Sequence, residues 1–356
     1  MRRHLRAAAG LVAGSTLLAA CAVSDKLPQS SLNPAGQPAG EQKDLLLLIV
    51  AIAAVIFVAV EAALIFFLFR YRHREGNEPL QIHGHSKTEI AWTIAPAIVL
   101  AVIAVPTVSM IYSQAAVPKG ESITVYAVGH QWWWEFVYPD QKVVTANEMY
   151  IPTDTQVHVE LCSAGNTAVG TPIGEPCTDP PPAIGDAVIH SFWVPRLAGK
   201  QDVVPGRTNS LTLTADEPGE YPGQCAEFCG MSHGFMKFKV IAATPADFQA
   251  WVSNEQSESV APAASSLEGA GLEAFKNTGC VGCHVVEPES AGIGGPNLTH
   301  FASRDCFAGC MLDINEENLQ RWLRDPAAVK PGSFMPNLHL TEEQVKSITA
   351  YLLSLE

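Results

Sequence analysis

Residues 225–236 carry a group of side chains that could bind metal ions. Cys225 and Cys229 lie four positions apart, His233 and Met236 follow them, and His190 lies further upstream. Thiolates, imidazoles and a thioether form a soft ligand set that suits copper. A mononuclear blue-copper site needs one Cys and two His, whereas two thiolates can bridge two copper ions that share one electron. The pattern therefore predicts a two-copper electron-transfer centre.

Two simpler interpretations compete with this centre. Cys225 and Cys229 could form a disulfide that leaves His233 on the surface, or the cysteines and the histidine could hold zinc. A disulfide explains neither His233 nor Met236, and zinc does not explain Met236. Copper is favoured because it gives a role to every side chain in the group.

A second motif, Cys280-Val-Gly-Cys283-His284, has the C-x-x-C-H spacing that attaches haem c covalently. The two thiols would form thioethers, and His284 would ligate the iron. A thioredoxin-type dithiol is the alternative, but it belongs in a βαβ unit, and this segment is small and helical. A methionine as the sixth ligand would raise the reduction potential into the range of cytochromes c, and Met311 and Met335 are the candidates.

The hydropathy pattern indicates how these groups are anchored. Residues 45–69 contain a single charge and residues 90–112 contain none. At about 1.5 Å per residue each segment exceeds the roughly 30 Å hydrocarbon core, so both are predicted to cross a membrane as helices. Basic residues in the connecting loop predict, by the positive-inside bias, that this loop is cytoplasmic. Everything after residue 113 is then expected outside.

The N-terminus resembles an export signal, because three arginines precede an apolar segment that is too short to span a bilayer. Leu18-Ala-Ala-Cys21 resembles the lipobox of bacterial lipoproteins, which implies cleavage before Cys21 and a lipid on its thiol; ordinary signal cleavage is the alternative. Residues 1–20 are thus predicted to be a signal peptide. Residues 21–43, rich in Ser, Pro, Gly and Gln, are predicted to form a flexible tether.

The chain is predicted to have several domains. A two-helix transmembrane hairpin spans residues 44–113. Short alternating strands separated by turns predict an all-β sandwich over residues 114–252. An Ala- and Ser-rich linker covers residues 253–266. Helical periodicity predicts an all-α domain over residues 267–356.

Charge and cysteine content restrict the partners and the compartment. The net charge of −14 argues against nucleic acid as a partner. Nine cysteines in a chain with an export signal indicate an oxidising compartment. Cys162 and Cys177 lie in a loop-like stretch and are predicted to pair. Cys306 and Cys310 could form a local disulfide or remain two thiols.

Residues 44–252 resemble subunit II of haem-copper cytochrome c oxidases. The resemblance rests on the copper loop and on Gly129-His-Gln-Trp-Trp-Trp-Glu, His190-Ser-Phe-Trp-Val-Pro and Pro205-Gly-Arg207. It implies a cupredoxin-like fold and a binuclear CuA centre whose two coppers are bridged by both cysteines. By that resemblance His190 and Met236 complete one copper, and His233 with the main-chain oxygen of Glu227 completes the other.

The same resemblance implies three further roles. The Glu227 side chain corresponds to a magnesium ligand at the interface with subunit I. Trp132 matches the aromatic residue that receives electrons from cytochrome c, although aromatic runs also serve packing. Glu89 matches the carboxylate at the mouth of a proton pathway into subunit I, and an acid favoured by the helix dipole is the alternative. The insertion between Leu161 and Asp186 departs from the family pattern but leaves every copper ligand in place.

The C-terminal domain resembles class I cytochromes c. Phe334-Met335-Pro-Asn matches the distal loop of that family, which favours Met335 over Met311 as the axial ligand. The whole chain resembles subunit II of caa-type oxidases, which carries its own cytochrome c. In a bacterial inner membrane, with both domains on the outer, periplasmic side, such a subunit assembles with subunits I and III.

The expected function is subunit II of a respiratory cytochrome c oxidase. The external donor would be cytochrome c or the quinol–cytochrome c reductase complex. Electrons would pass through haem c and CuA to subunit I, which reduces oxygen to water and translocates protons. A CuA subunit of a nitric oxide reductase, or a membrane-anchored copper or electron-shuttle protein working alone, remains open as an alternative.

Overall fold

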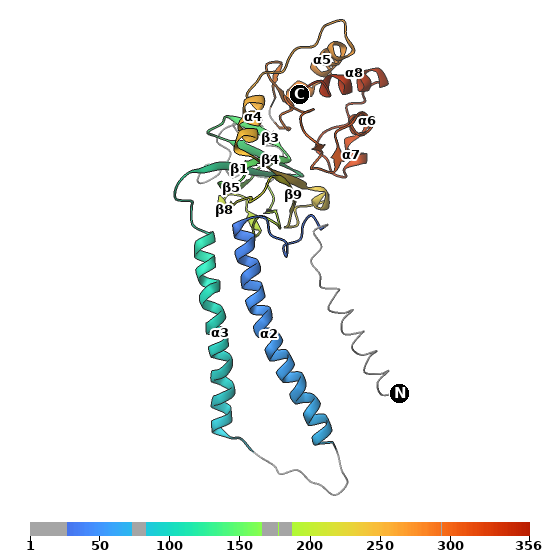
Figure 1. Cartoon of the computed structure of the whole chain (residues 1–356). Coiled ribbons are helices and arrows are strands. Elements are labelled where there is room, and N and C mark those ends of the chain that lie inside the picture. The colour runs from blue at the N-terminus through green and yellow to red at the C-terminus, as the bar shows by residue number, and fades with distance from the viewer. Residues whose placement is uncertain (1–26, 73–82, 166–176, 178–186, 293) are drawn as a thin grey trace, which may run out of the picture.

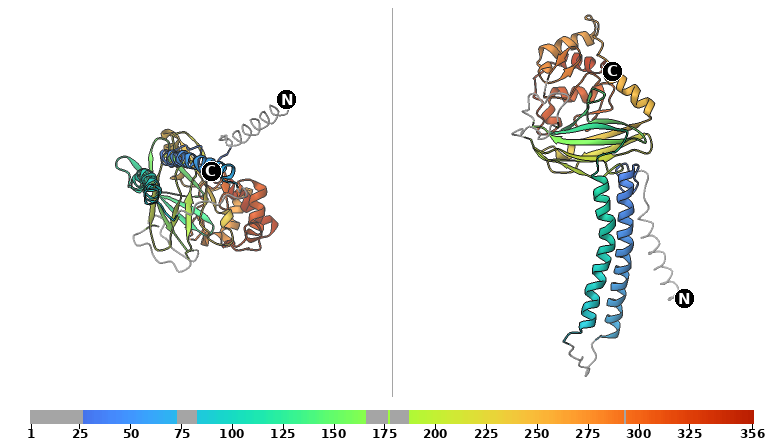
Figure 2. Two further views of the ribbon diagram at one scale, coloured as in Figure 1. Left: turned by 90° about the horizontal axis from the view of Figure 1, so that it is seen from below. Right: turned by 90° about the vertical axis from the view of Figure 1, so that its left-hand side faces the viewer.

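The structure, a computed structural model, describes residues 27–72, 83–165, 177, 187–292 and 294–356. Two long helices, a β-sandwich and a mainly helical C-terminal domain are stacked in that order (Figure 1 and Figure 2). The predicted architecture is confirmed. The predicted signal peptide and Cys21 lie outside the described residues.

The two long helices are α2 (Gln37–Arg70) and α3 (Ser86–Gln114), and they contain both predicted membrane spans. They lie side by side and extend away from the sandwich (Figure 1 and Figure 2). Both are long and apolar enough to cross a membrane, and their most apolar stretches are not buried by the rest of the protein. Lipid is the solvent that suits such helices, because their backbone hydrogen bonds are satisfied internally.

The residues before α2 are attached to the sandwich. The predicted tether extends to residue 43, but the helix already begins at Gln37. Ahead of it, the Ala35 N–H donates to the Arg196 carbonyl (2.7 Å), and the Arg196 Nε donates to the Asn33 carbonyl (2.8 Å). Ala35 is part of the sandwich core, so residues 33–36 form a packed segment rather than a free tether.

The sandwich consists of two five-stranded sheets with the orders β3-β2-β1-β5-β8 and β4-β10-β9-β6-β7. The first contains β1 (Ser122–His130), β2 (Trp133–Tyr138), β3 (Val143–Ala146), β5 (Gln156–Ser163) and β8 (Asn209–Leu213). The second contains β4 (Glu148–Pro152), β6 (His190–Trp193), β7 (Gln201–Val203), β9 (Gly219–Cys225) and β10 (Lys237–Ala243). Apolar side chains alternate inward along the strands, and Trp134, Phe136, Phe192 and Phe238 pack between the sheets.

The C-terminal domain contains α5 (Leu267–Asn277), α6 (Glu316–Arg324), α7 (Pro326–Val329) and α8 (Glu342–Leu352). Helices α5 and α8 cross closely at Gly271, where a side chain would meet the Ser347 carbonyl. The helices agree with the prediction. The domain also contains two short strand pairs that helical periodicity could not reveal, β11 (Val285–Val286) with β12 (Ser290–Ala291) and β13 (Cys306–Phe307) with β14 (Leu312–Asp313).

The predicted linker is bonded to both domains. Helix α4 (Pro245–Glu255) continues into it, because Thr244 caps the helix and Phe248 and Val252 pack on the sandwich. Beyond α4, the Ser259 N–H donates to the Glu287 carbonyl (2.9 Å). The ring nitrogens of His300 lie 3.0 Å and 2.8 Å from the carbonyl oxygens of Ser257 and Glu356. The segment is therefore fastened rather than free.

Candidate copper and haem sites

The predicted copper ligands come together at one end of the sandwich. His190 is the first residue of β6 and Cys225 is the last of β9, and these strands are neighbours. Cys229 lies in the loop that follows, and the short 3₁₀ helix η1 (His233–Phe235) presents His233 before Met236 returns the chain to β10. Residues that are distant in sequence thus meet because β9 lies between β6 and β10.

The donor atoms of this group lie close to one another. The two cysteine sulfurs are 3.8 Å apart. Cys225 Sγ lies 3.9 Å from His190 Nδ1 and 3.2 Å from the main-chain oxygen of Glu227. Cys229 Sγ lies 3.6 Å from His233 Nδ1 and 3.8 Å from Met236 Sδ.

These distances fit shared metal ions and do not fit a disulfide. A disulfide holds its sulfurs about 2.05 Å apart, and Cys225 and Cys229 are both free thiols. Donors that bind one ion at about 2.0–2.3 Å lie roughly 3.3–3.8 Å from each other in tetrahedral geometry. The site combines thiolate, thioether and imidazole donors, which suit a soft transition metal such as copper.

The electrostatics favour the ligating forms of His190 and Cys225, whereas the hydrogen bond to Cys225 and burial raise the pKa of the Cys229 thiol. Burial lowers the pKa of His190 below its ordinary value, so the imidazole is neutral and can offer a lone pair. A hydrogen bond from the Cys229 thiol, together with contacts to His190 and to main-chain groups, holds the pKa of Cys225 well below that of a free thiol. A thiolate is the form that binds metal.

Trp132 lies directly against the copper loop. Its indole Nε1 donates to the Cys229 carbonyl (3.0 Å), and the Gln131 side chain donates to the same oxygen (2.7 Å). The ring is only 6% exposed, because part of the C-terminal domain covers it. The sequence pattern gave no indication of the role of Gln131, since an amide in an aromatic run has no distinctive spacing.

The haem motif lies at the start of the C-terminal domain. Cys280 is buried in the 3₁₀ helix η2 (Cys280–Gly282), whereas Cys283 is exposed. His284 Nδ1 lies 2.9 Å from the Pro296 carbonyl, which fixes the ring and leaves Nε2 for a metal. Gly295 packs on this ring, because a Cβ there would lie 2.7 Å from its Cε1. Burial lowers the pKa of His284, so the ring is neutral.

Met335 lies beside an indole. The Nε1 of Trp322 is 3.1 Å from its Sδ, and the side chain packs against the core of the domain. Two thiols, an imidazole and a thioether are the donor types that a covalently attached haem c uses, and Cys280, Cys283, His284 and Met335 supply them.

The remaining candidate residues have clear positions. Cys162 and Cys177 form a disulfide, and so do Cys306 and Cys310. Glu89 lies in the first turn of α3, where its carboxylate accepts the His85 N–H (3.0 Å). This contact is the one expected of an acidic residue at a helix N-terminus. Most of the predicted insertion lies outside the described residues.

Comparisons with known proteins cover nearly all of the chain. Residues 28–110 match the transmembrane domain of cytochrome c oxidase subunit II, residues 123–243 match its periplasmic domain, and residues 269–356 match cytochrome c. Cytochrome c oxidase subunit 2 of Alkalihalophilus pseudofirmus is 36% identical over 335 residues, which are 92% of this chain and 91% of that protein. The subunit 2 of Bacillus sp. strain PS3 is 36% identical over 349 residues, with the same coverage.

A solved structure also matches part of the chain. The periplasmic domain of subunit II of cytochrome oxidase from Bradyrhizobium japonicum is 27% identical, covering 40% of this chain and 97% of that chain with a TM-score of 0.32.

An electron-transfer domain of cupredoxin type, anchored by two membrane helices, defines a membrane-bound subunit of a terminal oxidase complex. The chain belongs to the family of cytochrome c oxidase subunit II, and a cytochrome c domain is fused to its C-terminal side. It therefore assembles with other subunits of an oxidase.

Proposed function

We propose that this chain takes electrons from an external donor at haem c and delivers them through CuA to the oxygen-reducing subunit I. The observation that carries the proposal is the cluster of His190, Cys225, Cys229, His233 and Met236, whose donor atoms lie 3.6–3.9 Å from their neighbours. No simpler role uses all five side chains together.

The protein residues have distinct tasks at the copper site. Cys225 and Cys229, together with His190, Met236, His233 and the main-chain oxygen of Glu227, would hold the copper pair. A copper pair held in this way supplies a one-electron carrier. The Trp132 and Gln131 hydrogen bonds to the Cys229 carbonyl hold the ligand loop in place, and burial of His190 and of both cysteines excludes water.

The haem site is assigned in the same way. Cys280 and Cys283 would attach the porphyrin, and a haem with His284 and Met335 as ligands supplies a second one-electron carrier. The contact between Pro296 and His284 Nδ1 orients the imidazole. The Trp322 N–H directed at Met335 Sδ holds the thioether in place.

The remaining parts of the proposal concern the membrane and the complex. Both outer domains lie on the periplasmic side of a bacterial inner membrane, and Cys21 carries a lipid. The Glu227 side chain binds magnesium against subunit I, and Glu89 lies at a proton path that serves proton translocation. Subunit III completes the complex, and cytochrome c or the quinol–cytochrome c reductase complex donates the electrons. Phe228 and Met231 support a subunit contact at the copper loop, because both are about 70% exposed.

Spectroscopy of the purified complex tests the proposal. We expect a mixed-valence two-copper signal in electron paramagnetic resonance, a low-spin c-type haem band, and oxygen consumption with reduced cytochrome c. Cys229→Ser should abolish the two-copper signal and leave the haem band, whereas Cys177→Ser, which changes a cysteine outside the cluster, should keep both. A single redox-silent ion, or a disulfide between Cys225 and Cys229, would refute the copper assignment.

A further inference from the structure

Lys330 reaches from the cytochrome domain into the copper domain. Its Nζ donates to the Trp132 carbonyl at 2.5 Å and to the Ala308 carbonyl at 2.7 Å. The side chain is only 3% exposed. One buried amine thus joins a residue of the sandwich to a residue of the hairpin formed by β13 and β14.

A buried ammonium group is costly, because it loses its hydration. Within the described part of the chain, no carboxylate forms an ion pair with Lys330. Burial lowers its pKa to about 7. Two neutral main-chain oxygens are therefore its hydrogen-bond partners, and they belong to different domains. A lysine that is buried at this cost between the two domains is expected to have a specific role at their interface.

Two glycines allow the close approach around Lys330. Gly309 has φ +76°, and a Cβ there would lie 2.6 Å from Lys330 Nζ and 2.9 Å from the Trp132 oxygen. Gly332 has φ +81°, and its Cβ would lie 2.7 Å from the Trp132 ring. Both positions combine a left-handed backbone with no room for a side chain, which glycine alone satisfies.

The segment that runs from Lys330 to Phe334 also places the Phe334 ring against Trp132. The two ring centroids are 5.9 Å apart, and Phe334 is followed in the chain by the proposed haem ligand Met335. On the other side, the Trp132 indole donates to the Cys229 carbonyl. A continuous series of contacts therefore connects the two candidate centres through Phe334 and Trp132.

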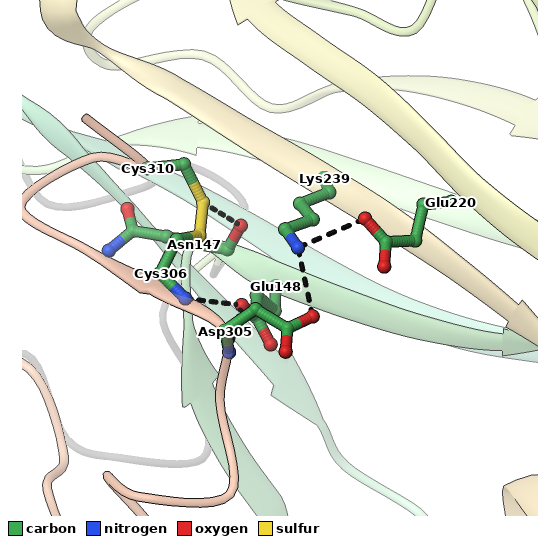
Figure 3. Close-up of polar contacts among 7 residues, drawn as sticks. All are labelled: Asn147, Glu148, Glu220, Lys239, Asp305, Cys306 and Cys310. Atoms are coloured by element: carbon green, nitrogen blue, oxygen red, sulfur yellow. Dashed lines mark hydrogen bonds and ion pairs between the residues drawn. A yellow bond between two sulfur atoms is a disulfide. The ribbon is translucent and has the colours of Figure 1, made fainter. Parts of the chain in front are cut away.

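A second contact region supports the hairpin from the side (Figure 3). Glu148 of β4 accepts the N–H groups of Asp305 (2.8 Å) and Cys306 (3.0 Å). Lys239 lies between the carboxylates of Glu220 and Asp305, at 3.0 Å and 2.9 Å. The hairpin is thus held by β4 and β10 at one end, and its Ala308 carbonyl receives Lys330 at the other.

We propose that Lys330 is a positioning residue for electron transfer between the two domains, because it fixes the cytochrome domain where Phe334 meets Trp132. The electron-transfer part of this inference rests on the proposed function. The docking part does not, because the contacts involve protein atoms alone.

Hydrogen exchange of the full-length protein in detergent tests the docking part. The Lys237 N–H donates to the Gly309 carbonyl (3.0 Å), and the Cys306 N–H donates to Glu148, so both report on the interface. In Lys330→Met these amides should exchange at least about tenfold faster. The Val345 amide inside α8 should keep its wild-type rate.

The matched control is Arg324→Gln, which breaks an exposed ion pair with Glu342 within the cytochrome domain. It should leave the exchange of the Lys237 and Cys306 amides unchanged. Wild-type exchange of both amides in Lys330→Met would overturn the proposal. If Lys330→Met does not fold, Phe334→Ala tests the same contact, because this ring is 57% exposed and its loss uncovers no buried charge.

The electron-transfer part is measured in the loaded oxidase complex. A light-activated reductant delivers one electron to the haem. Transfer of this electron to the copper pair is then followed as the reoxidation of the haem and the reduction of the copper pair. Lys330→Met and Phe334→Ala should each slow this step by about tenfold or more, with unchanged haem and copper spectra and unchanged haem reduction by cytochrome c. Equal rates in wild type and Lys330→Met would refute the positioning role. A wild-type complex that lacks either cofactor, or shows no transfer, would instead refute the proposed function.

Discussion

Glu148 provides a test of the buried interface that depends on pH. The side chain is 1% exposed; Oε1 accepts two main-chain N–H groups from the hairpin, but Oε2 has no hydrogen-bond partner. Burial raises the pKa of this carboxyl from 4.5 to about 7, against the opposing effects of the Asp305 N–H, Lys239 and Arg304. We consider Glu148→Gln, which keeps an acceptor for the hairpin and removes the titration.

The sign follows from comparing folded and unfolded chains. Below pH 4.5 Glu148 is protonated in both, so its contribution to stability is fully present. Between pH 4.5 and about 7 the unfolded chain ionises while the folded chain keeps the proton, so the wild type loses stability as the pH rises. The span between the two pKa values corresponds to a loss of about 3 kcal/mol. Glu148→Gln should lack this part of the loss.

Denaturant unfolding of the full-length chain in detergent, followed by circular dichroism from pH 4.5 to 8, measures the effect. The quantity compared is the change in unfolding free energy with pH, because a glutamine amide in place of Oε2 adds a cost that does not vary with pH. Glu220→Gln is the control, since its exposed ion pair with Lys239 contributes little. Parallel pH profiles of wild type and Glu148→Gln would refute the reasoning.

Three further changes have defined outcomes. Cys177→Ser removes the disulfide between Cys162 and Cys177, which are 15 positions apart. Its loss should lower the unfolding free energy by about 3 kcal/mol in denaturant titrations; an unchanged midpoint would contradict this. Met335→Ala should lower the haem reduction potential in a redox titration while the haem stays attached, because a thioether ligand favours the reduced iron; an unchanged potential would point to another ligand. Thr341→Ala removes the capping box that Thr341 forms with Gln344 and should destabilise α8 by about 1 kcal/mol in thermal melts; full stability would mean that packing alone sets this helix end.

The sequence was sufficient for the features that depend on local pattern. Long apolar runs predicted α2 and α3, and alternating residues predicted the sandwich. Cys225, Cys229, His233 and Met236 lie within one loop, so their spacing alone indicated a shared site. His190 was added by residue type and resemblance, and the neighbouring positions of β6 and β9 explain why it belongs there.

Contacts between domains could not be predicted in this way. Lys330 and Glu148 are charged residues in segments without a motif, and sequence patterns place such residues on the surface. Their burial depends on how two domains pack, which no local spacing records. The composition of the predicted linker suggested mobility, yet the Ser259 hydroxyl donates to the Glu287 carbonyl and the His300 ring contacts the Ser257 carbonyl. Small polar residues are equally suited to solvent and to main-chain partners.

The attachment of α2 has a consequence for how the subunit presents its metal loop. Gly36 lies so close to the Thr214 carbonyl that no side chain fits, and the Asn33 and Ala35 main chains are bonded to Arg196. The helix and the sandwich are therefore rigidly connected, so a tilt of the sandwich would require α2 to tilt within the bilayer as well. The position of α2 in the bilayer thus fixes the distance of the candidate copper ligands from the membrane and their orientation. A neighbouring membrane subunit would therefore meet these ligands in a fixed orientation.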